Sequence, residues 1–344
     1  MKREDYRELL ADISSADFAQ DPSPGWAGVA TLFGSKLVNR ASVPKCAYIA
    51  AGVPFDATAS SRPGASEGPG AIRHASRVFS SYLDSLGEHE MLDTRTGQAF
   101  RYQNPSLCDV GDLHVYPTNI KKTFQALAIE TQQLAQSGAT LILLGGDHSI
   151  SFALFSGVMI ANKERDSADR IGYIQIDHHF DFGSNSALHG PIYHGSNARR
   201  ISELPGISPS RIAFIGAGSV TRKDQFEFLI HNGFHVITAA QIRKRGAQES
   251  LSELVRDFNR DCDRVYLSID IDVLNAADAP GTGNVTYGGL DVATLMDVID
   301  QLRMLRLVAI DLVEVAPRYD PSGRTAQVAA QIIFETVYRN AASD

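Results

Sequence analysis

Cysteine is scarce in this 344-residue sequence, which contains only Cys46, Cys108 and Cys262. Three cysteines that lie far apart do not fit the disulfide framework of a small secreted domain, and they favour a reducing compartment. We interpret all three as buried apolar side chains. Because no cysteine lies beside the acidic and histidine clusters of the chain, a zinc site built from thiolates is excluded.

Long apolar segments and an excess of positive charge are also missing. No segment approaches the ~20 apolar residues that a membrane-spanning helix needs. The amino terminus, Met-Lys-Arg-Glu-Asp, lacks the apolar stretch of a secretory signal. The formal net charge is -8, which argues against a nucleic-acid partner, because such proteins neutralise phosphates with clustered Lys and Arg. We therefore expect a cytoplasmic protein that binds neither membrane nor nucleic acid.

The composition and pattern are those of an α/β protein. Hydrophobic residues make up 44% of the chain, which predicts a large buried core. Residues 1–45 are interpreted as an N-terminal helix and a Pro- and Gly-containing arm, and residues 46–344 as one catalytic domain. In that domain β-rich runs alternate with amphipathic stretches, which predicts a mostly parallel sheet. The predicted strands are Ala47–Val53, Thr140–Leu144, Ile171–Ile176, Arg211–Ile215, His235–Thr238, Val265–Ile271 and Leu307–Val313; the predicted helices include Ile120–Gln136, Leu251–Asn259, Val292–Met304 and Thr325–Tyr338.

The first candidate ligand follows an apolar strand. The run Leu141–Leu144 leads directly into Gly145-Gly146-Asp147-His148. In open parallel sheets ligands bind beyond the carboxyl ends of the strands, so His148 is expected at the rim of a site. On its own, a histidine at a strand end more often makes a structural hydrogen bond than binds a metal.

Two acidic clusters follow two other predicted strands. Asp177, His179 and Asp181 come after the strand that ends at Ile176, and Asp270 and Asp272 close another. If the backbone stays extended, alternate side chains share one side, so the members of each cluster point together. Converging carboxylates are costly unless a cation neutralises them.

Four carboxylates and two imidazoles are enough to hold two divalent ions. Oxygen-rich ligation with some imidazole suits manganese, and nickel or cobalt also fit. Two ions ~3.5–4 Å apart would hold a bridging water, lower its pKa and polarise an electrophile. The clusters therefore predict hydrolytic chemistry.

These segments resemble the three metal-binding motifs of the ureohydrolase family, which contains arginases and agmatinases. The similarity continues over nearly the whole chain and is greatest to the agmatinase-like branch. It implies a single three-layer, arginase-like domain with helices on both faces of the sheet. The matching residues are 25–31, 52–56, 62–65, 68–69, 71–73, 146–149, 177–181, 268–272, 276, 280–281, 288–290, 311–317 and 319–320.

The resemblance also implies ligand sets. One ion would be held by His148, Asp177, Asp181 and Asp270. The other would be held by Asp177, His179, Asp270 and Asp272, with Asp177 and Asp270 shared. The implied reaction is addition of the bridging hydroxide to a guanidino carbon, which releases urea and an amine.

Three residues are expected to act in catalysis by the same resemblance. Asp181 is both ligand and catalytic residue, Glu314 pairs with the substrate guanidinium, and His194 carries a proton to the leaving amine. His189 is a competing candidate for the proton carrier. Each assignment has a structural alternative. Glu314 would then be an acid at a strand end that forms an ion pair, and either histidine would be an ordinary residue of a surface loop.

Two further features bear on specificity. His178 stands where relatives usually carry a small residue. In extended backbone it faces away from the metals, whereas a turn just after Asp177 would rotate it toward them and alter the metal preference. Arg222 and Lys223 would receive a carboxylate tail, or they are simply solvated at a helix start. The candidate substrates are agmatine, a guanidino acid and free guanidine.

The alternative within the family is a formimino-group hydrolase that releases formamide. A second alternative is a metal-binding relative that has lost catalysis. The presence of all six ligand positions argues against it. A nucleotide-binding reading lacks a phosphate-cradling glycine fingerprint after the first strand. The resemblance further implies a homo-oligomer, either a trimer or a hexamer.

Overall fold

The computed structural model describes residues 29–339, apart from 87–88, 95–96, 166–169 and 219. The predicted N-terminal helix lies outside the described residues. The rest of the predicted arm packs on the body of the protein: Leu32 and Phe33 are buried in the core, and β1 pairs with β5 at the edge of the main sheet.

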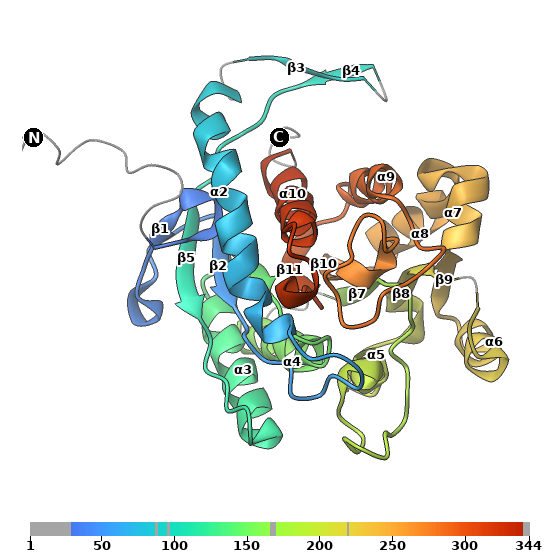
Figure 1. Ribbon diagram of the computed structural model, residues 1–344. Coiled ribbons are helices and arrows are strands. Elements are labelled where there is room, and N and C mark those ends of the chain that lie inside the picture. The colour runs from blue at the N-terminus through green and yellow to red at the C-terminus, as the bar shows by residue number, and fades with distance from the viewer. Residues whose placement is uncertain (1–28, 87–88, 95–96, 166–169, 219, 340–344) are drawn as a thin grey trace, which may run out of the picture.

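The main sheet has nine strands, and all of its neighbouring strands are parallel, as expected. Their order is β1-β5-β2-β6-β11-β10-β7-β8-β9. A separate antiparallel pair, β3 (Met91–Asp93) and β4 (Gln98–Phe100), projects beyond the end of α2 (Figure 1). The strands of the main sheet are β1 Lys36–Leu37, β2 Tyr48–Gly52, β5 Leu107–Asp112, β6 Thr140–Leu144, β7 Ile171–Ile176, β8 Ile212–Ala217, β9 His235–Thr238, β10 Arg264–Asp270 and β11 Leu307–Val313.

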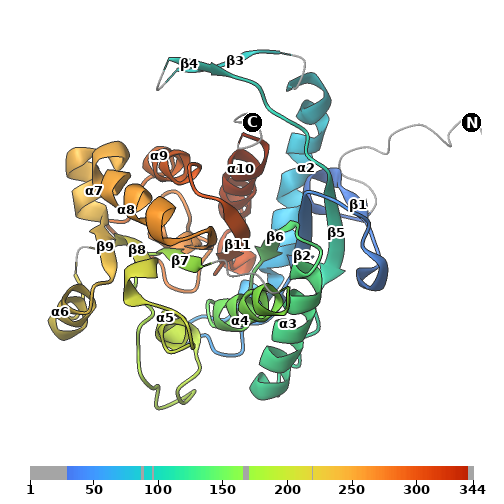
Figure 2. The same cartoon turned by 180° about the vertical axis from the view of Figure 1, so that it is seen from behind.

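Helices cover both faces of this sheet (Figures 1 and 2). Helices α2, α10, α9, α8 and α7 lie on one face, and α3, α4 and α5 lie on the other. No helix in the described part of the chain is both long and apolar enough to cross a bilayer. The helix bounds are α2 Gly68–Leu86, α3 Ile120–Ala135, α4 Ile150–Glu164, α5 Asn197–Ser202, α6 Lys223–His231, α7 Ala239–Arg245, α8 Ala247–Asp261, α9 Val292–Leu302 and α10 Arg324–Tyr338.

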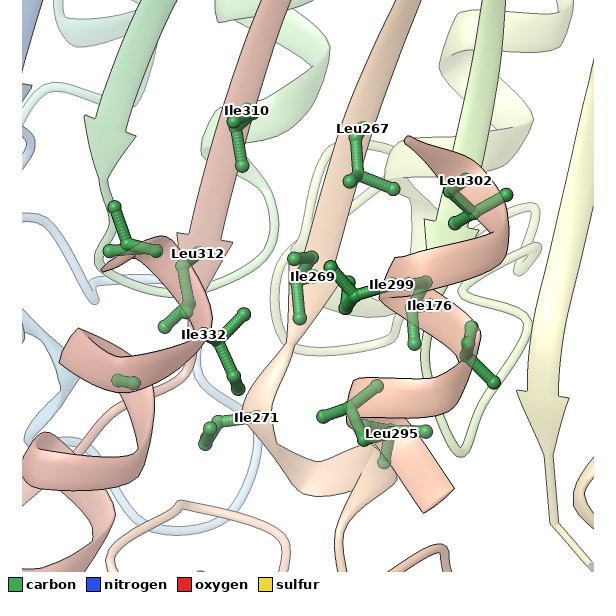
Figure 3. Close-up of a cluster of buried hydrophobic side chains, with 14 of the residues drawn as sticks. Ile176, Leu267, Ile269, Ile271, Leu295, Ile299, Leu302, Ile310, Leu312 and Ile332 are labelled. Atoms are coloured by element: carbon green, nitrogen blue, oxygen red, sulfur yellow. The ribbon is translucent and has the colours of Figure 1, made fainter. Parts of the chain in front are cut away.

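The three layers follow from side-chain alternation along strands that are apolar on both faces. In β10, Leu267 and Ile269 belong to the same buried cluster as Ile299 of α9 and Ile332 of α10 (Figure 3). The residue between Val265 and Leu267, Tyr266, belongs to the opposite core and packs edge-on against Phe155 of α4, with ring centroids 5.5 Å apart. Each central strand therefore joins two separate hydrophobic cores.

The strand order brings the predicted clusters together. Strands β6, β11, β10 and β7 are consecutive neighbours in the centre of the sheet. Ile269 of β10 is in register with Ile176 of β7, so Asp270 and Asp177 come next on adjacent strands. Because parallel strands end at the same edge, the residues that follow these four strands meet there.

Candidate metal centre

Three of the predicted ligands surround an imidazole nitrogen of a fourth. The Nδ1 atom of His148 lies 3.2 Å from Asp177 Oδ2, 3.0 Å from Asp181 Oδ2 and 3.1 Å from Asp270 Oδ2. Of these side chains, His148 is fully buried and Asp270 is only 3% exposed as a residue. One ligand atom from each of the four residues lies within 4.8 Å of the others, which is the spacing of a metal site.

A second group adjoins the first. His179 Nδ1 lies 3.1 Å from Asp272 Oδ2 and 3.5 Å from Asp177 Oδ1. Asp177 thus offers one oxygen to each group. Asp270 joins the first group with Oδ2, while its Oδ1 accepts a hydrogen bond from the backbone N–H of Asp272 at 2.8 Å.

The backbone that presents these ligands is not extended, contrary to our expectation. Strand β7 ends at Ile176 and residues 178–179 form a bend. Asp181 has φ of 44°, in the left-handed region that non-glycine residues rarely adopt. Likewise β10 ends at Asp270, and a 3-10 turn over Ile271–Val273 follows. The bend, the left-handed residue and the 3-10 turn bring these side chains together, in place of the alternation of an extended strand.

A row of buried polar side chains on the strands contacts the candidate ligands. Gln175, Ser268 and Asp311 are register partners on β7, β10 and β11. Gln175 Nε2 donates to Asp177 Oδ2 at 2.7 Å. Ser268 Oγ donates to Asp311 Oδ1 and lies 2.9 Å from His148 Nε2. Because the Ser268 proton goes to Asp311, Ser268 accepts from Nε2–H, and this leaves the Nδ1 lone pair of His148 for a cation.

Burial makes the carboxylates of this cluster expensive to ionise. Burial is the main effect that raises the pKa of Asp270 well above its usual value and that of Asp272 to about 7, and neighbouring carboxylates add to it. Burial also raises the pKa of Asp181, with Asp177 contributing. Asp177 is the exception: its pKa is lowered, because the interactions of its carboxylate with the imidazoles of His148 and His179 outweigh burial.

Divalent cations fit this donor set. The carboxylates are crowded and buried, Nδ1 of His148 has no hydrogen bond of acceptable geometry, and neither has Oδ1 of Asp272. Positive charge placed among them would offset the cost of ionisation. Oxygen and imidazole ligands in these proportions suit manganese, nickel or cobalt.

Glu314 lies directly beside the first group. It follows β11, and its Oε1 accepts a hydrogen bond from the backbone N–H of His148 at 2.9 Å. Its φ of 63° is a second strained non-glycine conformation, which costs on the order of 1–3 kcal/mol and is typical of functional residues. The backbone is held in place by the Glu314 N–H, which donates to Gly146 O at 2.9 Å.

The structure separates the two histidines that were candidates for the proton carrier. His194 Nδ1 lies 3.3 Å from Glu314 Oε1. Burial lowers the pKa of His194, but Glu314 outweighs burial and raises it to about 9. His189 instead lines a mostly apolar cavity of about 650 Å³ with Phe124 of α3 and Phe152 of α4. His194 is therefore the histidine that accompanies Glu314.

The residues that bear on specificity have local partners. His178 packs against Gly218, where an added Cβ would lie 2.1 Å from the His178 Nε2 atom. Burial, followed by the charge of His179, lowers the pKa of His178. Arg222 pairs with Asp224 at 2.5 Å, and Lys223 pairs with Glu227 at 3.6 Å, all four being well exposed.

Sequence reasoning missed several residues that act on the site. Asn197 donates to Asp181 Oδ2 at 3.2 Å, and Ser60 reaches His194 from a distant loop. These two carry no recognisable sequence signal. Gln175 and Ser268 do carry one, because each is a polar residue in an apolar strand, two positions before a ligand and so on the same strand face.

Both the sequence and the fold of this chain are similar to those of known proteins. The sequence matches the model of the arginase family over residues 47–338. The mitochondrial agmatinase of Gallus gallus is 32% identical over 322 residues, which cover 93% of this chain and 87% of that protein. The mitochondrial guanidino acid hydrolase of Homo sapiens is 30% identical over 334 residues, covering 96% and 89%. Among solved structures, proclavaminate amidino hydrolase from Streptomyces clavuligerus has a TM-score of 0.75 and 25% identity, covering 94% of this chain and 100% of that one.

Proposed function

The chain belongs to the arginase family, and from that premise we propose that it uses two divalent cations to cleave a guanidino C–N bond, releasing urea and an amine. Its relatives are hydrolases of C–N bonds in linear amidines. The observation that carries the proposal is the convergence of His148, three carboxylates and Glu314 at one edge of the sheet.

The proposed ligands divide into two sets that share Asp177. His148, Asp177, Asp181 and Asp270 would hold one cation, and Asp177, His179 and Asp272 the other, with Asp270 as a second shared ligand. When bound, two such cations supply Lewis acidity and an activated water. Manganese is the first candidate, with nickel or cobalt as alternatives.

Glu314 is proposed to bind the substrate guanidinium. A carboxylate and a guanidinium form planar, charge-assisted hydrogen bonds. While Oε1 of Glu314 is engaged by the His148 N–H, its Oε2 faces Gly283, where an added Cβ would lie 3.7 Å away. The same Cβ would lie 2.9 Å from the carbonyl oxygen of Arg62, so the close approach of that loop requires glycine at this position.

His194 is proposed to give a proton to the leaving amine. The water oxygen adds to the carbon of the guanidinium, the bond from that carbon to the substituted nitrogen breaks, and this nitrogen takes the proton of His194. Of the two protons of the water, one restores His194 and the other completes the ammonium ion of the product. With a pKa raised to about 9 by Glu314, His194 is protonated at neutral pH and able to donate.

The substrate is proposed to be agmatine, a guanidino acid or guanidine. The local ion pairs of Arg222 and Lys223 do not favour a carboxylate tail over the ammonium tail of agmatine. The alternative, hydrolysis of a formimino group, would use the same cations and give formamide.

Product analysis tests this proposal. Protein loaded separately with manganese, nickel or cobalt is incubated with agmatine, guanidinobutyrate, guanidinopropionate, guanidine and a formimino amino acid, and urea and formamide are measured. We expect urea from at least one guanidino compound. Formamide without urea would establish the alternative, and neither product from any compound would overturn the proposal.

A variant of Glu314 connects the activity to this site. Removing one partner of a buried charge pair costs at least about 2 kcal/mol, so Glu314→Gln should lower kcat/KM at least about 30-fold. Glu253→Gln, at a side chain that is 78% exposed, is the control and should match the wild type. Equal activity of all three proteins would contradict the proposed role.

The remaining parts of the proposal concern assembly and location. The few, widely separated cysteines favour a reducing compartment, and we propose a cytoplasmic location on that ground. The resemblance of the sequence implies a trimer or a hexamer. Light scattering coupled to size-exclusion chromatography measures the assembly, and a monomeric mass would refute that part.

A further inference from the structure

Ser60 contacts His194 from a loop that is 134 residues away in the sequence. The Oγ atom of Ser60 lies 2.7 Å from His194 Nε2, and the backbone N–H of Ser60 points at the same atom from 3.2 Å. Nδ1, on the other side of the ring, faces Glu314 Oε1 at 3.3 Å. The imidazole is thus held between Ser60 and Glu314.

The loop that carries Ser60 is fixed on both sides of it. Before it, the backbone N–H and the hydroxyl of Thr58 donate to Asp147 Oδ2 at 2.8 and 2.9 Å. After it, Arg62 donates to the carbonyls of Thr282 and Gly283 at 2.8 and 3.1 Å. Asp147 is fully buried, so the position of Ser60 is set by the protein interior although Ser60 itself is exposed.

The contact decides which nitrogen of His194 carries the proton. A backbone N–H can only donate, so Nε2 of the neutral ring accepts from Ser60 and Nδ1 carries the proton that faces Glu314. In the charged ring both nitrogens are protonated, and Nε2–H then needs an acceptor. The Ser60 hydroxyl can accept as well as donate, so it serves both forms of the ring.

We infer that Ser60 is a positioning residue that holds the His194 imidazole with Nδ1 toward Glu314 and the substrate. The inference rests on the proposed function, because it concerns the histidine that gives a proton to the leaving amine. Without the hydroxyl, His194 loses its short hydrogen bond on the Nε2 side and the ring is free to turn away from Glu314.

Kinetics of Ser60→Ala test the inference, with Ser60→Thr as the conservative variant and Ser61→Ala as the control on the same exposed loop. Loss of one positioning contact should lower kcat about 10-fold and leave KM within about twofold, since substrate binding is assigned to Glu314. Ser60→Thr should restore most of kcat, and Ser61→Ala should match the wild type. A kcat of Ser60→Ala equal to that of the wild type, where the wild type releases urea, would overturn the inference and leave the proposed function standing.

A second readout does not need catalysis. In Ser60→Ala the neutral ring keeps the backbone N–H of residue 60 as a donor to Nε2, whereas the charged ring loses its acceptor. The pKa of His194 should therefore fall by about one unit. The titratable groups that act on His194 are Glu314, Asp181 and Asp147, and none of them is changed in this variant. Deuterium exchange at the imidazole C2 position, followed by fragment mass spectrometry, measures the pKa of His194 in the metal-loaded protein.

The two readouts separate the possible failures. If the wild-type protein releases no urea, the proposed function fails, and the exchange measurement alone decides whether Ser60 positions His194. An unchanged pKa of His194 in Ser60→Ala would overturn the inference in that case too. A lowered pKa in Ser60→Ala that Ser60→Thr restores would support it.

Discussion

Replacing Ser268 with alanine removes the support of a proposed metal ligand without changing a ligand. Ser268 Oγ accepts from His148 Nε2 at 2.9 Å and donates to Asp311 Oδ1 at 2.5 Å. In Ser268→Ala the buried Nε2–H has no acceptor and the ring has nothing to fix its tautomer. Asp311 keeps the hydrogen bond that it accepts from the hydroxyl of Tyr266 at 2.7 Å. The main effect of the substitution should therefore be on the orientation and tautomer of His148.

Two independent estimates of the effect agree. Loss of a hydrogen-bond partner behind a metal-binding histidine typically weakens metal binding 10- to 100-fold, which corresponds to about 1.4–2.7 kcal/mol. A buried N–H group left without an acceptor costs about 1–3 kcal/mol. We therefore expect the dissociation constant of the cation held by the His148 group to rise by about 10- to 100-fold.

Calorimetric titration of metal-free protein with manganese, in competition with a chelator, measures this change. Ser76→Ala is the matched control, because Ser76 is also fully buried and makes two hydrogen bonds, to the N–H of Phe33 and the carbonyl of Arg73. It should lose stability without losing metal affinity. Ser268→Ala protein that binds manganese as tightly as the wild type would refute the reasoning from the His148 tautomer.

Three further outcomes are expected. His194→Asn should lower kcat for urea release about 10²- to 10⁴-fold, whereas His189→Asn should stay within about twofold; the reverse result would make His189 the proton carrier. The pKa of Asp272 is raised to about 7 by burial, and that of His194 is raised to about 9, burial being outweighed by Glu314. Because both groups hold protons more tightly in the folded chain than in the unfolded chain, the metal-free protein should lose stability as pH rises from about 4 to about 9. Melting temperatures in chelator that increase from pH 5 to pH 9 would contradict this sign. Ile299→Ala, in the core shown in Figure 3, should lower the free energy of unfolding in denaturant by about 2–5 kcal/mol. The control Met304→Ala, at a side chain that is 72% exposed, should lower it by less than about 0.5 kcal/mol. Equal losses in the two variants would place Ile299 outside the core.

The strands of the sheet were largely predictable, because buried parallel strands are continuous apolar runs. Strand β5 was missed for a physical reason. Its sequence, Leu-Cys-Asp-Val-Gly-Asp, places two carboxylates and a glycine in a short strand. Asp109 is fully buried there because Arg73 of α2 pairs with it at 2.9 Å. A partner 36 residues away is not visible in the local pattern.

The residues proposed as metal ligands could be singled out from the sequence, since each follows an apolar strand. Their mutual placement could not be predicted, because it depends on the strand order, which puts β11 and β10 between β6 and β7. The left-handed conformations of Asp181 and Glu314 were equally hidden, because tertiary contacts impose them against the local preference. The contact of Ser60 with His194 could not be predicted at all from the sequence, since only the folded chain brings the two residues together.

Counting bound metal tests the central claim most directly. Wild-type protein and Asp177→Asn are loaded with manganese, freed of excess metal, and measured by elemental mass spectrometry with and without prior treatment with a strong chelator. We predict two manganese ions per wild-type chain, at most one in Asp177→Asn, and loss of urea release when chelation removes them. A wild-type chain that binds no manganese, or that hydrolyses its substrate at full rate after chelation, would contradict the account.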